Sequence, residues 1–278
     1  MRVTIQQLKD LKKRAEPIVM VTAYDYTSAK LVEQADIPII LVGDTLGQVM
    51  LGYESTIPVT IEEMLHHCRA VVRGTENSHI VVDMPFMSYN AEESESLRNA
   101  GRLLKEGEAN SVKLEGGQSV APVVCRMVEA GIPVMGHIGL RPQSVNQLSG
   151  YKVQGRSSAQ AAQLLADAVA LQDAGAYAIV LELVPAPLAK QITAKLTIPT
   201  IGIGAGPYCD GQVQVLHDIL GLFEDFVPKH TRRYADLGQQ IRRALSAYVT
   251  DVKDHQFPTA AQSYDLGDHS LSEFSTTI

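Results

Sequence analysis

The sequence predicts a (β/α)8 barrel, an α/β fold of the TIM type. Short apolar runs rich in Val and Ile recur along the chain, and longer stretches with apolar residues at three- and four-residue spacing lie between most of them. Continuous apolar runs are typical of parallel strands, because both faces of such strands are covered. Eight of these runs, separated by amphipathic stretches, form the pattern of a closed barrel.

The expected strands are the eight apolar runs Ile18–Ala23, Pro38–Gly43, His79–Asp83, Ser111–Glu115, Ile132–His137, Tyr177–Glu182, Pro199–Ile203 and Gln212–His217. Helical spacing is found at Ile61–Arg73, Glu92–Glu108, Ser119–Ala130, Ala159–Ala174 and Ala186–Lys195, and a final helix is expected at Tyr234–Asp251. Residues Gly204–Gly211 are too few for a crossover helix. The barrel is therefore expected to be irregular between strands seven and eight.

The chain is expected to form one domain over residues 1–278. Its 278 residues exceed the usual domain length, but barrels of about 250 residues fold as one unit. No internal repeat or linker divides the sequence. The tail from about residue 254 is polar and irregular, so it is expected to be loosely ordered or to dock on a neighbouring subunit.

Composition favours a cytoplasmic protein with small-molecule partners. The net charge of −7, without a long cluster of Lys and Arg, disfavours nucleic-acid binding. Three scattered cysteines without CxxC spacing indicate reduced thiols rather than disulfides or a zinc site. The first residues lack the apolar segment of a secretory signal, and no apolar run approaches the ~18 residues of a membrane helix.

Polar side chains end five successive predicted strands. They are Asp44, Asp83, Glu115, His137 and Glu182. Acidic residues make up 31 of the 278 positions, so four at neighbouring strand ends are unexpected by chance. Because active sites of barrels lie at the carboxyl ends of the strands, these side chains predict a site there.

Each of these residues also has a structural alternative. Asp44 and Asp83 could cap turns at the strand ends, and a lone His137 is more often structural than catalytic. Side chains alternate along a strand, so Lys113 shares a face with Glu115. The two could form a structural ion pair, or the lysine could face an anionic ligand, because burying it alone is costly.

Carboxylate ligands without cysteine favour Mg²⁺, which takes one or two direct carboxylates and completes its shell with water and ligand oxygens. Asp44 and Asp83 are the expected direct ligands, with Glu115 as a third ligand or behind a water. A 2-oxo acid would supply a carboxylate and a ketone oxygen, and the metal would acidify the neighbouring C–H. Glu182 would be the base. This set predicts a metal-dependent aldol-type enzyme.

Two long connections follow strand ends and are lid candidates, Thr45–Val59 and Ile138–Ser157. The pattern Gly202-x-Gly204-x-Gly206 resembles a phosphate-binding loop. It is a weak signal, because no helix clearly follows it to hold a phosphate.

The chain resembles the ketopantoate hydroxymethyltransferase family from the N-terminus to about Phe257. The motifs that carry the resemblance are Val21–Asp25, Val42–Gly47, Asp83–Phe86, Val112–Gly117, Gly136–Leu140, Pro142–Ser144, Tyr151–Arg156, Gly202–Pro207 and Leu216–Asp218. The resemblance implies a barrel of the phosphoenolpyruvate/pyruvate-binding kind. It also implies transfer of a hydroxymethyl group from 5,10-methylenetetrahydrofolate to 3-methyl-2-oxobutanoate, which gives 2-dehydropantoate in pantothenate synthesis.

The resemblance also implies roles for individual residues. Asp44, Asp83 and Glu115 match the Mg²⁺ site of the family, and Glu182 matches its proton acceptor. The keto-acid contacts match a partly overlapping set: Asp44, Thr45, Asp83, Lys113 and, with a less defined role, His137. Family members form large rings, so a homo-oligomer, for instance a decamer, is expected.

The chain departs from the family pattern at four positions. Thr45 replaces a serine, Arg141 replaces a threonine in the second lid candidate, Ser149 replaces a glycine, and Gln214 stands where an aliphatic residue is usual. Two alternatives stay open. One is a phosphoenolpyruvate mutase or lyase-like enzyme, which the absence of cysteine from Ile138–Ser157 disfavours. The other is a non-catalytic metabolite-binding barrel, which the complete set of polar residues disfavours.

Overall fold

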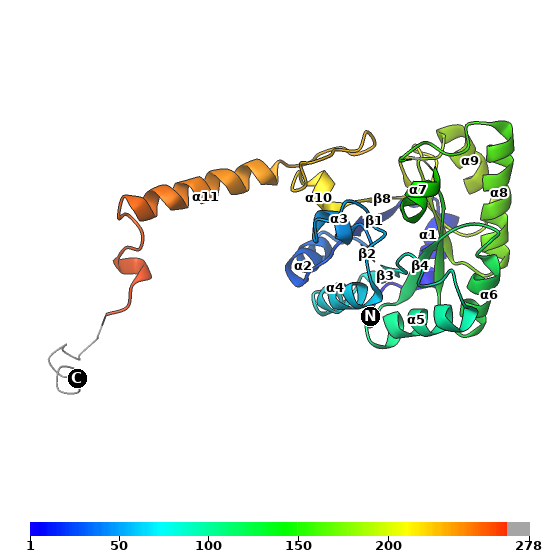
Figure 1. The fold of residues 1–278 in the computed structure, drawn as a ribbon, viewed down its shortest axis with the longest axis horizontal. Helices are drawn as coiled ribbons and strands as arrows, with labels where there is room; N and C mark the ends of the chain where they lie inside the picture. Colours follow the sequence, from blue (N-terminus) through cyan, green and yellow to red (C-terminus); the bar gives the residue numbers. More distant parts are fainter. Residues whose placement is uncertain (149, 266–278) are drawn as a thin grey trace.

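The protein is a closed barrel of parallel strands joined in chain order, β1 to β8. A computed structural model describes residues 1–148 and 150–265 (Figure 1). The strands are β1 (Ile18–Thr22), β2 (Ile39–Val42), β3 (His79–Asp83), β4 (Ser111–Glu115), β5 (Val134–Gly139), β6 (Ala178–Glu182), β7 (Thr200–Ile203) and β8 (Gly211–Gln214). The predicted (β/α)8 barrel is therefore confirmed.

One helix precedes the first strand, and among the described residues helices follow each strand except β7. They are α1 (Ile5–Lys13), α2 (Tyr26–Gln34), α3 (Leu46–Val49), α4 (Ile61–Arg73), α5 (Glu93–Lys105), α6 (Ala121–Glu129), α7 (Val145–Leu148), α8 (Ser158–Asp173), α9 (Ala186–Lys195), α10 (Leu216–Ile219) and α11 (Leu237–Lys253), with 3-10 turns η1 (Pro142–Ser144) and η2 (Ala260–Gln262). The six predicted helices are present. The other five were not predicted. For two of them, α1 and α2, Thr4 and Asp25 accept a hydrogen bond from the first turn, as N-cap residues do.

The eighth strand is shorter than predicted. The run Gln212–His217 was expected to be a strand, but β8 ends at Gln214 and α10 begins at Leu216. The Leu216 N–H donates to Oγ1 of Thr22, which draws the chain away from the sheet. Periodicity cannot distinguish a short strand from the first turn of a buried helix, because both are apolar runs.

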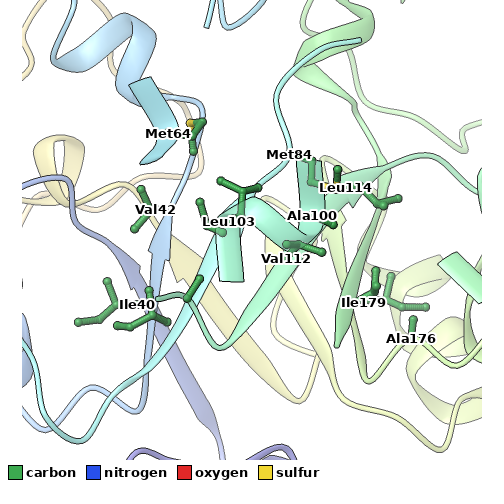
Figure 2. Close-up of a cluster of buried hydrophobic side chains, with 14 of the residues drawn as sticks. Ile40, Val42, Met64, Met84, Ala100, Leu103, Val112, Leu114, Ala176 and Ile179 are labelled. Carbon is green, nitrogen blue, oxygen red and sulfur yellow. The ribbon is translucent and has the colours of Figure 1, made fainter. Parts of the chain in front are cut away.

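Two layers of apolar residues hold the barrel. The outer layer lies between the sheet and the helices; Figure 2 shows part of it, including Val42, Met64 and Leu103. The inner layer fills the barrel interior, where Leu8 of α1 meets strand residues such as Met20 and Leu41. The alternation follows from the strand pleat, which sends successive side chains to opposite faces. The charged residues are left at the carboxyl ends of the strands.

The expected irregularity between β7 and β8 is confirmed, because the described residues of this connection contain no helix. Asp210 fixes the connection by accepting hydrogen bonds from Lys12, at 2.7 Å, and from the Thr200 N–H, at 2.8 Å. Without a covering helix, a cavity of about 960 Å³ lies against this side of the barrel. Val19 of β1, which lines it, is 49% exposed.

Helix α11 extends away from the barrel (Figure 1). It carries a row of exposed apolar side chains: Ile241, Leu245, Tyr248, Val249 and Val252. The expected polar tail begins where the helix ends and is exposed up to residue 265; residues 266–278 lie outside the described part. None of the described helices is long and apolar enough for a membrane span.

Candidate active site

The predicted polar residues meet at one small cavity of about 50 Å³ at the carboxyl ends of the strands. Asp83, Glu115 and Glu182 are the last residues of β3, β4 and β6, so the parallel register brings them to the same end of the barrel. Asp44, Thr45, Lys113 and His137 complete the predicted set, and all line this cavity. The larger cavity beside β7 and β8 shares the lining residue Gln214 with this one.

Lys113 and Asp83 are neighbours in the β3–β4 pairing and form a buried ion pair with a distance of 2.8 Å from Nζ to Oδ1. The other oxygen of Asp83 accepts from the Asp44 N–H at 3.0 Å. Burial lowers the pKa of Lys113, but the charges of Asp83, Glu115 and Asp44 outweigh this effect and raise it. The lysine therefore stays cationic, in contact with a carboxylate.

Asp44 and Glu115 resist ionisation. Burial, followed by the charge of Asp83, raises the pKa of Asp44 to about 7. Burial, followed by the charge of Asp44, raises the pKa of Glu115 well above its usual value. One lysine does not balance these carboxylates, so a further cation would favour their ionised form.

His137 lies between the two acids Glu115 and Glu182. Its Nδ1 is 3.4 Å from Nζ of Lys113 and 3.6 Å from Oε1 of Glu115. Its Nε2 is 3.1 Å from Oε2 of Glu182, although the contact is not aligned as a hydrogen bond. Burial and then the charge of Lys113 lower the pKa of His137 well below its usual value, so the ring is neutral.

The surroundings of Glu182 suit a general base. Burial raises its pKa to about 7, although the charges of Lys113 and His230 oppose this rise. A carboxylate with a pKa near neutrality accepts protons more readily than an ordinary one and is still partly ionised.

The second lid candidate enters the site through a residue that sequence reasoning missed. Gln143 of η1 is buried, and its amide donates to Oδ2 of Asp44 at 2.8 Å and to the Met84 carbonyl at 3.0 Å. Its backbone N–H donates to Oε2 of Glu115 at 3.1 Å, and Tyr89 donates to its Oε1 at 2.7 Å. The Pro-Gln-Ser motif marked this segment, but nothing local in the sequence shows that the glutamine points inward.

The donor set fits a metal with few protein ligands. No group of three or more His, Cys, Asp or Glu side chains in residues 1–148 and 150–265 is arranged to enclose an ion. Asp44 and Asp83, however, both line the cavity, where negative charge exceeds positive charge, and one or two carboxylates are what Mg²⁺ usually takes from a protein. Asp44 and Asp83 as direct ligands, and Glu115 as a third, stay predictions.

Solved structures similar to this chain share its barrel. One is a 2,3-dimethylmalate lyase of the phosphoenolpyruvate mutase/isocitrate lyase superfamily, with a TM-score of 0.59 and 15% identity, covering 95% of this chain and 93% of that one. Another is a phosphoenolpyruvate phosphomutase from Streptomyces platensis subsp. rosaceus, with a TM-score of 0.60 and 14% identity, covering 91% and 88%. Identities this low show the fold alone.

Sequence similarity is far higher to one family of enzymes. The family model described as ketopantoate hydroxymethyltransferase matches residues 2–260. The 3-methyl-2-oxobutanoate hydroxymethyltransferase of Dehalococcoides mccartyi is 57% identical over 278 residues, covering 100% of this chain and 99% of its own length. That of Chloroflexus aurantiacus is 58% identical over 258 residues, covering 93% and 91%. The chain therefore belongs to the ketopantoate hydroxymethyltransferase family and is a hydroxymethyltransferase enzyme.

Proposed function

We propose that the protein transfers a hydroxymethyl group from 5,10-methylenetetrahydrofolate to 3-methyl-2-oxobutanoate and releases 2-dehydropantoate. The keto acid is the one named for its curated relatives. The observation that carries the proposal is the arrangement of one cavity that combines a cationic lysine, paired carboxylates and a separate acid whose pKa is near neutrality. A positioned base and stabilisation of the developing negative charge both assist the removal of a proton beside a ketone.

Asp44 and Asp83 are the proposed ligands of Mg²⁺, with Glu115 as a third or indirect one. When bound, the ion supplies positive charge beside the ketone oxygen and stabilises an enolate. Lys113 and the Thr45 hydroxyl orient the keto acid, because both line the cavity and offer hydrogen-bond donors. The Thr45 side chain caps no backbone N–H of α3, which leaves it available for this contact.

Glu182 is the proposed base that removes the proton from C3 of the keto acid. The neutral ring of His137 lies 3.1 Å from the carboxylate, and its lowered pKa means that it does not compete for the proton. The resulting carbanion carbon forms a bond to the methylene carbon of the folate as the bond from that carbon to one folate nitrogen breaks. Water then replaces the second C–N bond and becomes the hydroxyl of the product. The two folate nitrogens take up the proton removed from C3 and one proton of the water, and tetrahydrofolate leaves.

A Glu182→Gln variant tests the assignment of the base. The amide keeps the shape of the side chain but cannot accept the proton, so exchange of the C3 proton with solvent, followed by NMR, should fall by about 10²–10⁴-fold. Binding of the keto acid should persist. Unimpaired exchange in the folded variant would show that another group is the base.

One assay separates the proposed activity from the two alternatives. Wild-type protein with Mg²⁺, keto acid and methylenetetrahydrofolate should produce 2-dehydropantoate, and chelation of the metal should stop it. Binding of the keto acid without turnover would indicate a non-catalytic barrel. Cleavage of a C–C or P–C bond in candidate substrates of the lyase and mutase class would indicate a related enzyme instead.

The protein is further proposed to be a cytoplasmic homo-oligomer, such as a decamer. The exposed apolar row of α11 supports assembly, because within residues 1–148 and 150–265 these side chains stay exposed and only Tyr248 has a ring contact, with Phe257. The three cysteines are free thiols, as expected in a reducing compartment.

A further inference from the structure

Gln143 is the one lid residue whose hydrogen bonds reach two of the strand-end carboxylates, within the described segments. It lies 99 residues from Asp44 and 28 residues from Glu115 in the sequence, yet its side-chain amide contacts the first and its backbone N–H contacts the second. Its side chain and the partner atoms are buried. The position of the connection after β5 and the orientation of these carboxylates are therefore linked through one residue.

Both N–H groups and the carbonyl oxygen of the Gln143 side chain have a hydrogen-bond partner. Its two N–H groups go to Asp44 and to the Met84 carbonyl, and its carbonyl oxygen accepts from the Tyr89 hydroxyl. The same hydroxyl also accepts from the Glu115 N–H at 3.1 Å. A buried amide satisfied at every atom fixes its neighbours more strongly than a solvated one, because each broken bond leaves a buried group unpaired.

Other side chains at residue 143 could not make this set of hydrogen bonds. A glutamate would set a second negative charge against Asp44, and an asparagine is one methylene shorter. A methionine fills the space but neither donates to Asp44 nor accepts from Tyr89. Within the described residues, no other hydrogen bond engages the Asp44 side chain, so Gln143 alone determines which oxygen of Asp44 is held by the protein.

We propose that Gln143 is a positioning residue that latches residues 139–148 beside the cavity and orients Asp44 for ligand binding. The latch acts through Asp44 and Glu115 rather than by contact with the substrate. The same hydrogen bonds then hold the connection in place and orient the carboxylates of Asp44 and Glu115. The kinetic part of this inference depends on the proposed function, whereas the structural part does not.

Gln143→Met in the full-length protein tests the latch, with Gln147→Met as the matched control. Gln147 is an exposed residue of α7 in the same connection. Gln143→Met should speed amide hydrogen exchange in residues 139–148, weaken Mg²⁺ binding in calorimetry by about 10- to 100-fold, and raise the KM for the keto acid. Gln147→Met should match the wild type in all three.

A purely structural role would give a different pattern. A smaller fraction of the variant would then be active, so kcat per total protein would fall while KM and Mg²⁺ affinity stayed unchanged. That result would overturn the proposal, and so would unchanged hydrogen exchange in residues 139–148. If wild-type protein makes no 2-dehydropantoate, the proposed function fails, and hydrogen exchange still decides the latch.

Tyr89→Phe keeps the test decisive should Gln143→Met fail to fold. It removes the hydroxyl that donates to the Gln143 carbonyl and accepts from the Glu115 N–H, and it leaves the bonds from Gln143 to Asp44 and Glu115 in place, so it should produce the same changes to a smaller extent. The double variant should be no worse than Gln143→Met alone, because both substitutions break one network. Wild-type exchange and affinity in a folded Tyr89→Phe protein would count against the latch.

Discussion

At the scale of single residues, the cavity holds more negative than positive charge. Among the described residues that line it, Lys113 is the one cationic side chain, since the lowered pKa of His137 keeps that ring neutral. Burial and mutual repulsion raise the pKa values of Asp44 and Glu115, which is unfavourable for a metal-free fold above neutral pH. Carboxylates that destabilise the metal-free fold in this way are those that strengthen the binding of a cation.

Asp44→Asn should therefore stabilise the metal-free protein while abolishing Mg²⁺ binding. Its amide still accepts a hydrogen bond from Gln143 but carries no charge. In the folded state the pKa of Asp44 is raised to about 7 from 3.8, so its unfavourable contribution grows as pH rises towards 7 and is full above it. In chelator above neutral pH, the gain should be about 0.5–2 kcal/mol, or a few degrees in Tm.

The same comparison at pH 5 supplies the control for this substitution. There Asp44 is already protonated in the folded wild type, so the difference in Tm between the two proteins should shrink. A gain that is equal at both pH values would show that charge is not its cause.

Activity should follow the ionisation of Glu182. A base must be unprotonated, and burial raises the pKa of Glu182 to about 7 from 4.5. At saturating Mg²⁺, kcat/KM for the keto acid should rise about tenfold per pH unit below 7 and level off above it. A rate that is flat from pH 5 upwards would mean that the group that accepts the proton has an ordinary carboxyl pKa.

At the scale of elements, the sequence predicts what depends on local pattern. Strand β3 and its terminal Asp83 were predictable to the residue, because a buried parallel strand is an uninterrupted apolar run that the acid ends. The end of β8 was not, since Leu216 is turned into α10 by a hydrogen bond to Thr22, 194 residues away. The role of Gln143 was hidden for the same reason. Contacts between distant segments leave no periodic signal in one sequence.

The end of β5 depends on a glycine at residue 139. Gly139 has a φ of +96°, and a Cβ there would lie 2.2 Å from the Glu182 carbonyl oxygen. Gly139→Ala should therefore displace the backbone of the proposed base, reduce kcat/KM by about 10²-fold and destabilise the fold by about 2–4 kcal/mol.

Gly131→Ala is the matched control for that substitution. Gly131 has a φ of +84°, but a Cβ there would meet nothing within 4 Å. It should cost only the left-handed conformation, about 1–2 kcal/mol in urea denaturation, with kcat/KM unchanged. Equal loss of activity in the two variants would show that backbone strain, and not the contact with Glu182, is responsible.

At the scale of the whole molecule, α11 stands out because it leaves a row of apolar side chains exposed within the described part of the chain. Its exposed apolar residues lie on one face of a helix that extends away from the barrel (Figure 1).

Leu245 and Val249 are one turn apart, so Leu245→Glu with Val249→Glu puts two charges on that face. If α11 packs in an assembly, light scattering should show a smaller particle, because burying unpaired carboxylates is costly. Thr250→Glu adds a charge to the opposite face and should leave the mass unchanged. The substituted residues are exposed on a helix that extends away from the barrel, so circular dichroism should report an intact fold in both variants. A double variant with the mass of the wild type would show that the apolar face of α11 does not hold the assembly together.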